Sequence, residues 1–493
     1  AFNGEIYNWR QLRQDLPGPW ETNCDAEVLA AAWRHWGEQC LYKLNGMWGF
    51  VLIDEWEQEI VLCRDRLGQK PLYWTMRGKR LYISSEAKSL PGALETAACD
   101  DCEALEYDVR ESTTLLGVYR IQPGSIAVLH EPKEPVPRPW WNMPEYTPAL
   151  TLEQGAEELE SLLVDSVRSR TEAEVPVAMM LSGGVDSSIL ATIAKKQSLP
   201  VAFYCMHFSE GHVDHSSAAK LAAGASPLQI VELQQDEFYD DLSKVAYHLD
   251  SPATWTASCL WALCRRMASD GNVITLSGEG ADELFAGYSR YRILYWLDRC
   301  YRDAGLESYH PLIGHMMQAQ SEDEVLVRML SRSKSHRALA RCTDLVRRFG
   351  GPEHAPLFER MARLETQTTM QVLLRMADRM SAAWSMENRC PFLDYRIIEL
   401  SGKLRPEAKV NNTTTKVVVR LVAARLGVPE QIWGLKEKHG LAVPWPKWRK
   451  HQPVSNRGLW DRTEFANLMR LLWRNSLDKS DLTHEAEQRM GGG

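Results

Sequence analysis

The pattern of hydrophobic and polar positions in the first part of the chain differs from the pattern in the rest. Early on, apolar residues come in short runs typical of strands: 46–54 and 60–65 are predicted to pair through the polar turn 55–59, and 81–85 is a further strand. Residues 27–36 have the apolar spacing of a helix. This pattern predicts an α+β layered domain.

A proline-dense segment, 131–139, separates the two parts of the chain, and Pro144 and Pro148 follow it. Proline fixes φ and lacks a backbone donor, so this segment cannot continue a strand or a helix and is predicted to be a semi-rigid linker. We therefore expect a domain boundary near residue 145, with one domain over residues 1–145 and another over 146–493.

In the second part, apolar runs of strand length alternate with helical patterns. The predicted strands are 175–181, 201–206 and 272–277, and the predicted helices are 152–168, 187–196 and 259–267. Strands that alternate with helices imply an α/β doubly wound parallel sheet. From Arg290 onward the pattern is mostly helical.

Composition narrows the class of protein. With 44% hydrophobic residues, 25% charged residues and a net charge of −8, the chain has the make-up of a globular protein and no basic stripe for nucleic acid. No apolar run approaches the ~18–20 residues that a membrane span needs. Eleven cysteines without framework spacing suit a reducing compartment, so we expect a cytoplasmic enzyme with no membrane partner.

The strongest chemical signal follows the first strand of the second part. Its residues are Leu181, Ser182, Gly183, Gly184, Val185, Asp186, Ser187 and Ser188. The two glycines allow close backbone approach, and the start of the next helix favours an anion such as phosphate. Asp186 would repel a phosphate unless a cation lay between them, which points to Mg²⁺. A plain glycine turn is the alternative, and the carboxylate and serines disfavour it.

A second loop, 277–288, follows the strand at 272–277. Ligands of parallel sheets bind outside the carboxyl ends of the strands, so Asp282 could share a cation with Asp186. Glu279 could orient or deprotonate an incoming nucleophile. A turn with solvated acids is the alternative, but three carboxylates at a buried strand end would repel one another without a cation.

These loops and several later motifs resemble those of the asparagine synthetase family. The motifs of the second part lie at 182–188, 277–288, 378–381, 387–394 and 438–444. The first part resembles the glutaminase domain of that family, a class II glutamine amidotransferase, at 2–8, 24–27, 64–73 and 85–88. The resemblance implies a glutaminase-type layered sandwich followed by an ATP-pyrophosphatase domain with a helical C-terminal part.

The resemblance also implies roles for single residues of the synthetase domain. The implied ATP-binding residues are Leu181, Ser182, Gly183, Gly184, Val185, Asp186, Ser187, Ser188, Met206, Ser277 and Gly278. Asp186 and Asp282 would bind Mg²⁺ together with pyrophosphate. Glu279 would lie where ammonia meets the activated acyl group, and Lys438 would stabilise charge on the reacting phosphorus or the departing pyrophosphate.

In the front domain the resemblance implies a glutamine site. Asn3 and Gly4 match oxyanion-hole positions, and Glu5 and Asp25 match positions that hold the α-amino group of glutamine. The nucleophile of the family is an N-terminal cysteine, whereas Ala1 matches a position well inside the domain. We therefore expect that residues upstream of Ala1 are missing, rather than that the nucleophile has changed.

The implied reaction is that of asparagine synthetase. ATP activates aspartate as β-aspartyl-AMP with release of pyrophosphate, and ammonia, which glutamine supplies in the complete enzyme, displaces AMP. An alternative is a relative that amidates or cyclises another carboxylate. Glu279 and the retained glutamine positions argue against the β-lactam branch, but they do not separate aspartate from other acceptors.

A second alternative is a non-catalytic nucleotide-binding relative. Such a protein should have lost Asp186, Asp282 or Lys438, and all three are present. The expected partners are therefore small molecules, namely aspartate, ATP and glutamine or ammonia. The sequence leaves open whether the chain forms a homo-oligomer.

Overall fold

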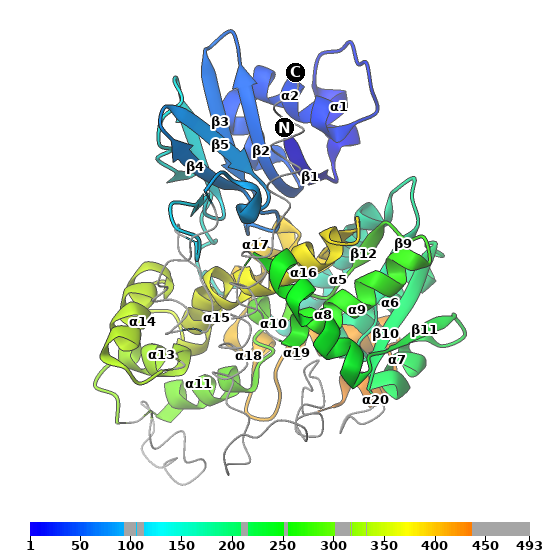
Figure 1. The fold of residues 1–493 in the computed structure, drawn as a ribbon. Helices are drawn as coiled ribbons and strands as arrows, with labels where there is room; N and C mark the ends of the chain where they lie inside the picture. The colour runs from blue at the N-terminus through cyan, green and yellow to red at the C-terminus, as the bar shows by residue number, and fades with distance from the viewer. Residues whose placement is uncertain are drawn as a thin grey trace.

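The computed structural model describes residues 1–92, 105, 113–208, 215–250, 255–300, 316, 318–331 and 333–435. Figure 1 shows the strands of the N-terminal part above a second, larger assembly of helices around a sheet. Lys438 and the rest of the motif at 438–444 lie outside the described residues.

The N-terminal part contains two antiparallel sheets. The larger has the order β1 (Phe2–Ile6), β2 (Gly46–Asp54), β3 (Glu59–Arg64), β7 (Ser125–Leu129), β8 (Arg138–Pro139), and the smaller has β5 (Arg80–Ser84), β4 (Tyr73–Arg77), β6 (Tyr119–Arg120). Among the described residues of this part, the helices are α1 (Trp9–Asp15), α2 (Asp25–Trp36) and α3 (Cys40–Lys43), with single 3-10 turns at Gly37–Gln39 and Ala87–Ser89. The predicted pairing of the strands now labelled β2 and β3 is confirmed.

Alternation along β3 explains the layers of this part. Val61 and Cys63 pack with the helices α1 and α2, whereas Leu62, between them, packs towards the smaller sheet. Successive strand side chains point to opposite faces, so a run of apolar residues here serves two cores. The result is the predicted α+β layered sandwich.

The proline-dense segment differs from the prediction at its end. Arg138 and Pro139 form the short strand β8, which pairs with Ile126 and Ser125 of β7. The expectation that no strand could form here is wrong at these two residues, because an edge strand tolerates proline. The adjacent Trp140 is buried and stacks on Trp48, which fixes the segment to the N-terminal part.

The second part is built on a five-stranded parallel sheet. Its order is β11 (Leu228–Glu232), β10 (Val201–His207), β9 (Val177–Met180), β12 (Ile274–Leu276), β13 (Glu387–Arg389), and every neighbouring pair is parallel. Val177 and Met179 of β9 face a core that includes α5 and α6, whereas Ala178 faces a core formed with α8, α9 and α16. Both faces of the sheet are thus covered, and the predicted doubly wound fold is confirmed.

Helices make up most of the remaining described chain. They are α5 (Leu152–Thr171), α6 (Val185–Lys196), α7 (His215–Ala223), α8 (Gln235–Leu249), α9 (Trp255–Ser269), α10 (Ala281–Leu284), α11 (Ser289–Cys300), α13 (Glu322–Leu330), α14 (His336–Phe349), α15 (Leu357–Gln367), α16 (Thr369–Ala382), α17 (Tyr395–Lys403), α18 (Pro406–Lys409), α19 (Val417–Leu426) and α20 (Glu430–Trp433), with a 3-10 turn at Pro391–Leu393. The predicted helical C-terminal part is confirmed. None of the described helices is long and apolar enough to cross a membrane.

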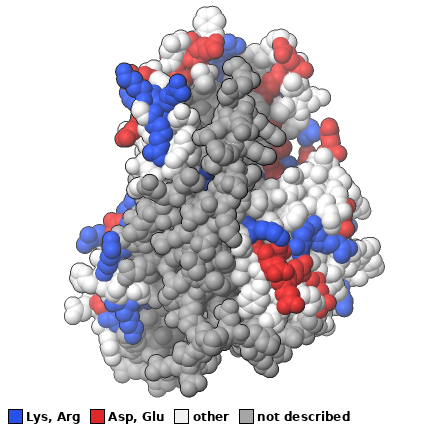
Figure 2. All heavy atoms as spheres, in the orientation of Figure 1, with Lys and Arg blue, Asp and Glu red and all other residues white. Residues whose placement is uncertain are grey.

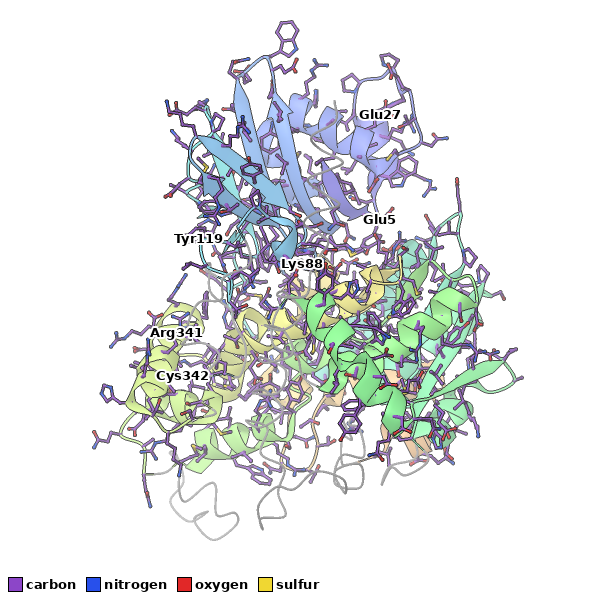
Figure 3. The ribbon with its side chains drawn as sticks, viewed as in Figure 1. Glu5, Glu27, Lys88, Tyr119, Arg341 and Cys342 are labelled. Carbon is purple, nitrogen blue, oxygen red and sulfur yellow. The ribbon has the colours of Figure 1, made fainter. Side chains whose placement is uncertain are left out.

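Charged side chains join the two parts. Lys70 Nζ lies 2.9 Å from Asp378 Oδ1, and Lys88 Nζ lies 3.1 Å from Asp250 Oδ1. Figure 3 labels Lys88 at the boundary between the upper strands and the lower helices. On the outer face in Figure 2, basic and acidic side chains of the described residues are mixed in small groups.

Candidate active site

A pocket of about 460 Å³ opens at the carboxyl ends of β9, β10 and β12. It brings together most of the predicted synthetase residues. Those that line it are Leu181, Ser182, Gly183, Gly184, Val185, Asp186, Ser187, Met206, Ser277, Gly278, Glu279 and Asp282. Ser188 does not line it, because its side chain is completely buried within α6.

The first loop has the geometry expected of an anion-binding turn. Gly183 has φ +76°, a left-handed conformation that favours glycine, and Gly184 precedes the first residue of α6. The hydroxyl of Ser187 accepts a hydrogen bond from the Ser182 backbone N–H at 3.2 Å. The start of α6 therefore presents backbone N–H groups and a positive dipole end to the pocket.

A buried lysine joins the two predicted metal ligands. Lys416 Nζ lies 2.6 Å from Asp186 Oδ2 and 2.8 Å from Asp282 Oδ1. Burial alone would lower the pKa of Lys416, but the two carboxylates outweigh burial and raise its pKa above the ordinary value. The ammonium is therefore a permanent positive charge on the pocket wall.

The chain leaves little space around this group. A Cβ on Gly287 would come within 1.9 Å of Asp282 Oδ1 and 2.2 Å of Lys416 Cε. A Cβ on Gly278 would lie 3.2 Å from Asp186 Cβ. Both glycines belong to the second loop: a side chain at 287 would displace Asp282 or Lys416, and one at 278 would press on Asp186.

The carboxylates also suit a magnesium ion that a substrate would help to hold. Asp186 Oδ1 is buried and accepts no hydrogen bond from the described residues. Those residues include no group of three or more His, Cys, Asp or Glu side chains able to hold a metal. Mg²⁺ is commonly bound through one or two carboxylates plus substrate phosphates, and Asp186 and Asp282 fit that mode.

Sequence reasoning missed two cations of this pocket. Lys416 and Arg420 both line it. Arg420 donates from Nε to Thr415 O at 2.8 Å and from Nη1 to Trp433 O, and burial lowers its pKa. The available signal was a lysine immediately before an apolar helix, followed four residues later by an arginine on the same helical face.

The predicted glutamine residues also lie together. Glu5 is on β1, and Asp25 begins α2 and accepts a hydrogen bond from the Ile6 N–H at 2.9 Å. A Cβ on Gly4 would come within 2.0 Å of Met47 O, so this position admits only glycine. Asn3 is next to it on β1, paired with Gly49 of β2.

The fold and pocket define an ATP-dependent ligase that carries a glutamine amidotransferase domain ahead of its synthetase domain. The family model described as asparagine synthase matches residues 158–482, and one described as glutamine amidotransferase domain matches residues 1–141. The chain belongs to the asparagine synthase family. The domain boundary near residue 145 stays a prediction.

Relatives of this chain include enzymes with different names. "Asparagine synthetase [glutamine-hydrolyzing] 1" of Bacillus subtilis is 30% identical, over 92% of this chain and 76% of the relative. A "Putative asparagine synthetase [glutamine-hydrolyzing]" of Mycobacterium tuberculosis is 28% identical, over 91% and 75%. "Amidase chry2" of Gibberella zeae is 25% identical, over 98% and 82%.

Proposed function

We propose that this chain is an asparagine synthetase that amidates aspartate through β-aspartyl-AMP. The observation that carries the proposal is the pocket in which both acidic loops meet around Lys416. A ligase that cleaves ATP next to the α-phosphorus needs a place for pyrophosphate, and the Ser182–Ser187 turn supplies donors on one side of the pocket. Lys416, which also lines the pocket, supplies a cation.

Two sets of groups would bind the phosphates. The backbone N–H groups at the start of α6 and the hydroxyls of Ser182 and Ser187 would donate to phosphate oxygens. Asp186 and Asp282 would hold Mg²⁺, which when bound neutralises part of the phosphate charge. Lys416 would orient both carboxylates and face the departing pyrophosphate, a role that suits a compact cation.

The adenosine would lie against the apolar wall of the same pocket. Leu181 and Met206 line it at the ends of β9 and β10, close to the phosphate turn. Apolar walls with few polar groups are typical of nucleotide pockets. This assignment puts the α-phosphorus between the turn and the second loop, where the acceptor must also bind.

Two displacement steps complete the reaction. A side-chain carboxylate oxygen of aspartate attacks the α-phosphorus, and pyrophosphate leaves with the electrons of the broken P–O bond. Ammonia then attacks the acyl carbon, and AMP leaves with the carboxylate oxygen. Glu279 would take the proton that the attacking nitrogen loses, and Lys438 would stabilise charge during the first step.

Glutamine would supply the ammonia in the complete enzyme. Asn3 and Gly4 would stabilise the oxyanion of glutamine hydrolysis, and Glu5 and Asp25 would hold the α-ammonium group. In support, Asn3, Gly4 and Glu5 are consecutive on β1, and Asp25 at the start of α2 accepts a hydrogen bond from the next β1 residue. Glu5 also contacts Arg389 of the synthetase part. A cytoplasmic location and homo-oligomerisation stay predictions.

A different carboxylate acceptor is the second candidate. The relatives named as amidases support it, because they match 98% and 92% of this chain at 25% and 24% identity under another name. The chemistry of ATP cleavage would be the same for either acceptor. Only the groups that recognise the rest of the acceptor would differ.

The test is product analysis with a panel of acceptors. The chain is incubated with ATP, Mg²⁺ and ammonium chloride, with aspartate, glutamate, malonate or succinate as the acceptor, and nucleotides and amides are separated. We expect AMP, pyrophosphate and asparagine, with aspartate at least tenfold faster than the other acids. AMP formation with another acid and none with aspartate would favour the second candidate, and ADP formation would exclude both.

A further inference from the structure

One arginine of the synthetase sheet contacts the predicted glutamine site. Arg389 ends β13, and its side chain, which is 5% exposed, reaches across to the front domain. Arg389 Nη2 lies 2.9 Å from Glu5 Oε2. Figure 3 places Glu5 at the lower edge of the front domain, facing the synthetase.

The guanidinium is fixed from its own domain. Arg389 Nε donates to Glu387 Oε1 at 2.7 Å, and Nη1 donates to Arg170 O at 3.1 Å. The ring of Tyr7, two residues after Glu5, lies 5.5 Å from the guanidinium carbon. Two nitrogens of this planar group are held within the synthetase domain, and the third, Nη2, is directed at Glu5, so the pair is preorganised.

The backbone of Arg389 contacts the nucleotide pocket. Its carbonyl accepts a hydrogen bond from the Ser277 N–H at 3.1 Å, and Ser277 is the first residue of the second loop. The same residue therefore contacts the predicted glutamine site through its side chain and the ATP-side loop through its backbone.

Glu5 needs such a partner because its surroundings oppose its charge. Burial raises the pKa of Glu5 to about 7, against the opposing effect of Arg389. The value of about 7 already includes the carboxylates of Asp25 and Glu387, which also raise the pKa, and Arg10, which lowers it. Near neutral pH the carboxyl of Glu5 is thus balanced between its two forms, and only the ionised form can pair with an ammonium group.

We propose that Arg389 is a positioning residue of the glutamine site, which keeps the Glu5 carboxylate ionised and oriented for the α-ammonium group of glutamine. The inference rests on the proposed function, because it takes Glu5 as a residue that binds glutamine. It adds that the glutamine site is complete only when the synthetase domain is docked. Glutamine binding is then tied to β13, whose Arg389 carbonyl accepts the hydrogen bond from Ser277 at the start of the second loop.

The test measures glutamine affinity by titration calorimetry between pH 5.5 and 8.5. It compares the wild-type chain with Arg389→Gln, Arg389→Lys, Glu5→Gln and the double variant Arg389→Gln/Glu5→Gln, each checked for a cooperative thermal transition. Wild-type affinity should fall as the pH drops through about 7. In Arg389→Gln the midpoint should move up by about one pH unit or more, because a neighbouring opposite charge is lost. Arg389→Lys should keep a midpoint close to that of the wild type.

The double variant separates electrostatics from packing. With Glu5→Gln nothing titrates at this position, so adding Arg389→Gln should cause no further pH-dependent change. A uniform loss of affinity at every pH, with the midpoint unmoved, would reduce Arg389 to a packing role and overturn the inference. Absence of glutamine binding in the wild type at every pH would overturn it as well.

Failure of the proposed function gives a different signature. If the midpoint shifts as expected but ATP, aspartate and ammonium chloride give no AMP, the inference about Arg389 stands and the proposed synthetase reaction is wrong. If AMP and asparagine form but the Arg389 variants do not move the midpoint, the proposed synthetase reaction stands and the inference about Arg389 is wrong.

Discussion

Two buried lysines of this molecule have similar partners and different surroundings. Lys416 lies within 2.8 Å of both Asp186 and Asp282, and Lys70 lies 2.9 Å from Asp378 and 3.8 Å from Glu387. In both cases burial would lower the pKa of the lysine and the two carboxylates outweigh it, so that the pKa is raised.

The difference lies in access. Lys416 lines the 460 Å³ pocket, whereas Lys70 is closed in where the front domain contacts α16 and β13. A raised pKa and a pair of carboxylates therefore do not identify an active site by themselves. Asp186 and Asp282, which pair with Lys416, line the pocket and can bind a ligand from solution. Asp378 and Glu387, which pair with Lys70, do not line the pocket.

The largest expected effect is on catalysis at Lys416. Lys416→Met should lower the rate of AMP formation by about 10²–10³-fold, because it removes a preorganised cation beside the leaving pyrophosphate. The matched control is Lys70→Met, which should keep its rate per folded molecule. Rates are measured from AMP release with saturating aspartate and ammonium. Equal loss in both variants would contradict the distinction between the two lysines.

Stability, in contrast to the AMP-forming rate, should be affected more by the substitution at Lys70 than by the one at Lys416. Lys70→Met leaves Asp378 buried without its cation, which should lower the free energy of unfolding by about 3 kcal/mol. Urea unfolding followed by tryptophan fluorescence measures this change. A loss below about 1 kcal/mol would mean that Asp378 finds another partner or water in the variant.

Substitutions of the carboxylates that pair with the two lysines should also differ in their effect on the Mg²⁺ dependence of activity. Asp186→Asn or Asp282→Asn should raise the Mg²⁺ concentration for half-maximal activity at least ~10-fold, since each would lose a charged ligand. Asp378→Asn, in the closed cluster, should leave that concentration unchanged. An unaltered Mg²⁺ dependence in both pocket variants would show that these carboxylates do not bind the ion.

Sequence patterns predicted the two folds because their elements are local. The runs at 175–181 and 201–206 are apolar enough to be buried strands, and they became β9 and β10. By contrast β13, with the sequence Glu387-Asn388-Arg389, carries no apolar signal. It is a strand because β12 provides a parallel partner, and no local rule anticipates that pairing.

Residues of the candidate site could be predicted where they belong to a continuous sequence motif. Those that reach the site from distant parts of the chain were missed. Asp186 and Asp282 each follow a predicted strand, so their meeting could be inferred from sheet topology. Lys416 reaches Asp186 across 230 residues of sequence, and Lys70 reaches Asp378 across 308. Which lysine faces the pocket depends on packing between distant helices and loops, which spacing along the chain does not encode.

The smallest expected effect lies at a third ion-paired group, on the rim of the domain contact. Burial would raise the pKa of Glu86, but Arg379 and Lys88 outweigh it and lower the pKa to about 2. A lowered folded-state pKa adds stability above pH ~4.5 that is lost as the pH falls towards about 2. Glu86→Gln should flatten this dependence by at most ~1 kcal/mol, because the side chain is partly exposed.

Thermal unfolding between pH 3 and 6 checks this change against the wild type. A steeper acid dependence in Glu86→Gln than in the wild type would contradict the sign of the shift. Because Glu86 is not among the residues that line the pocket, the AMP-forming rate at neutral pH should not follow the change in stability.

The most direct measurement of the central claim follows oxygen through the pocket. Aspartate labelled with ¹⁸O in its side-chain carboxylate is converted with ATP, Mg²⁺ and ammonium chloride, and the products are analysed by mass spectrometry. The account predicts one ¹⁸O atom in each AMP, unlabelled pyrophosphate and one asparagine per AMP, since the carboxylate attacks the α-phosphorus. Unlabelled AMP, or ADP with labelled phosphate, would contradict it.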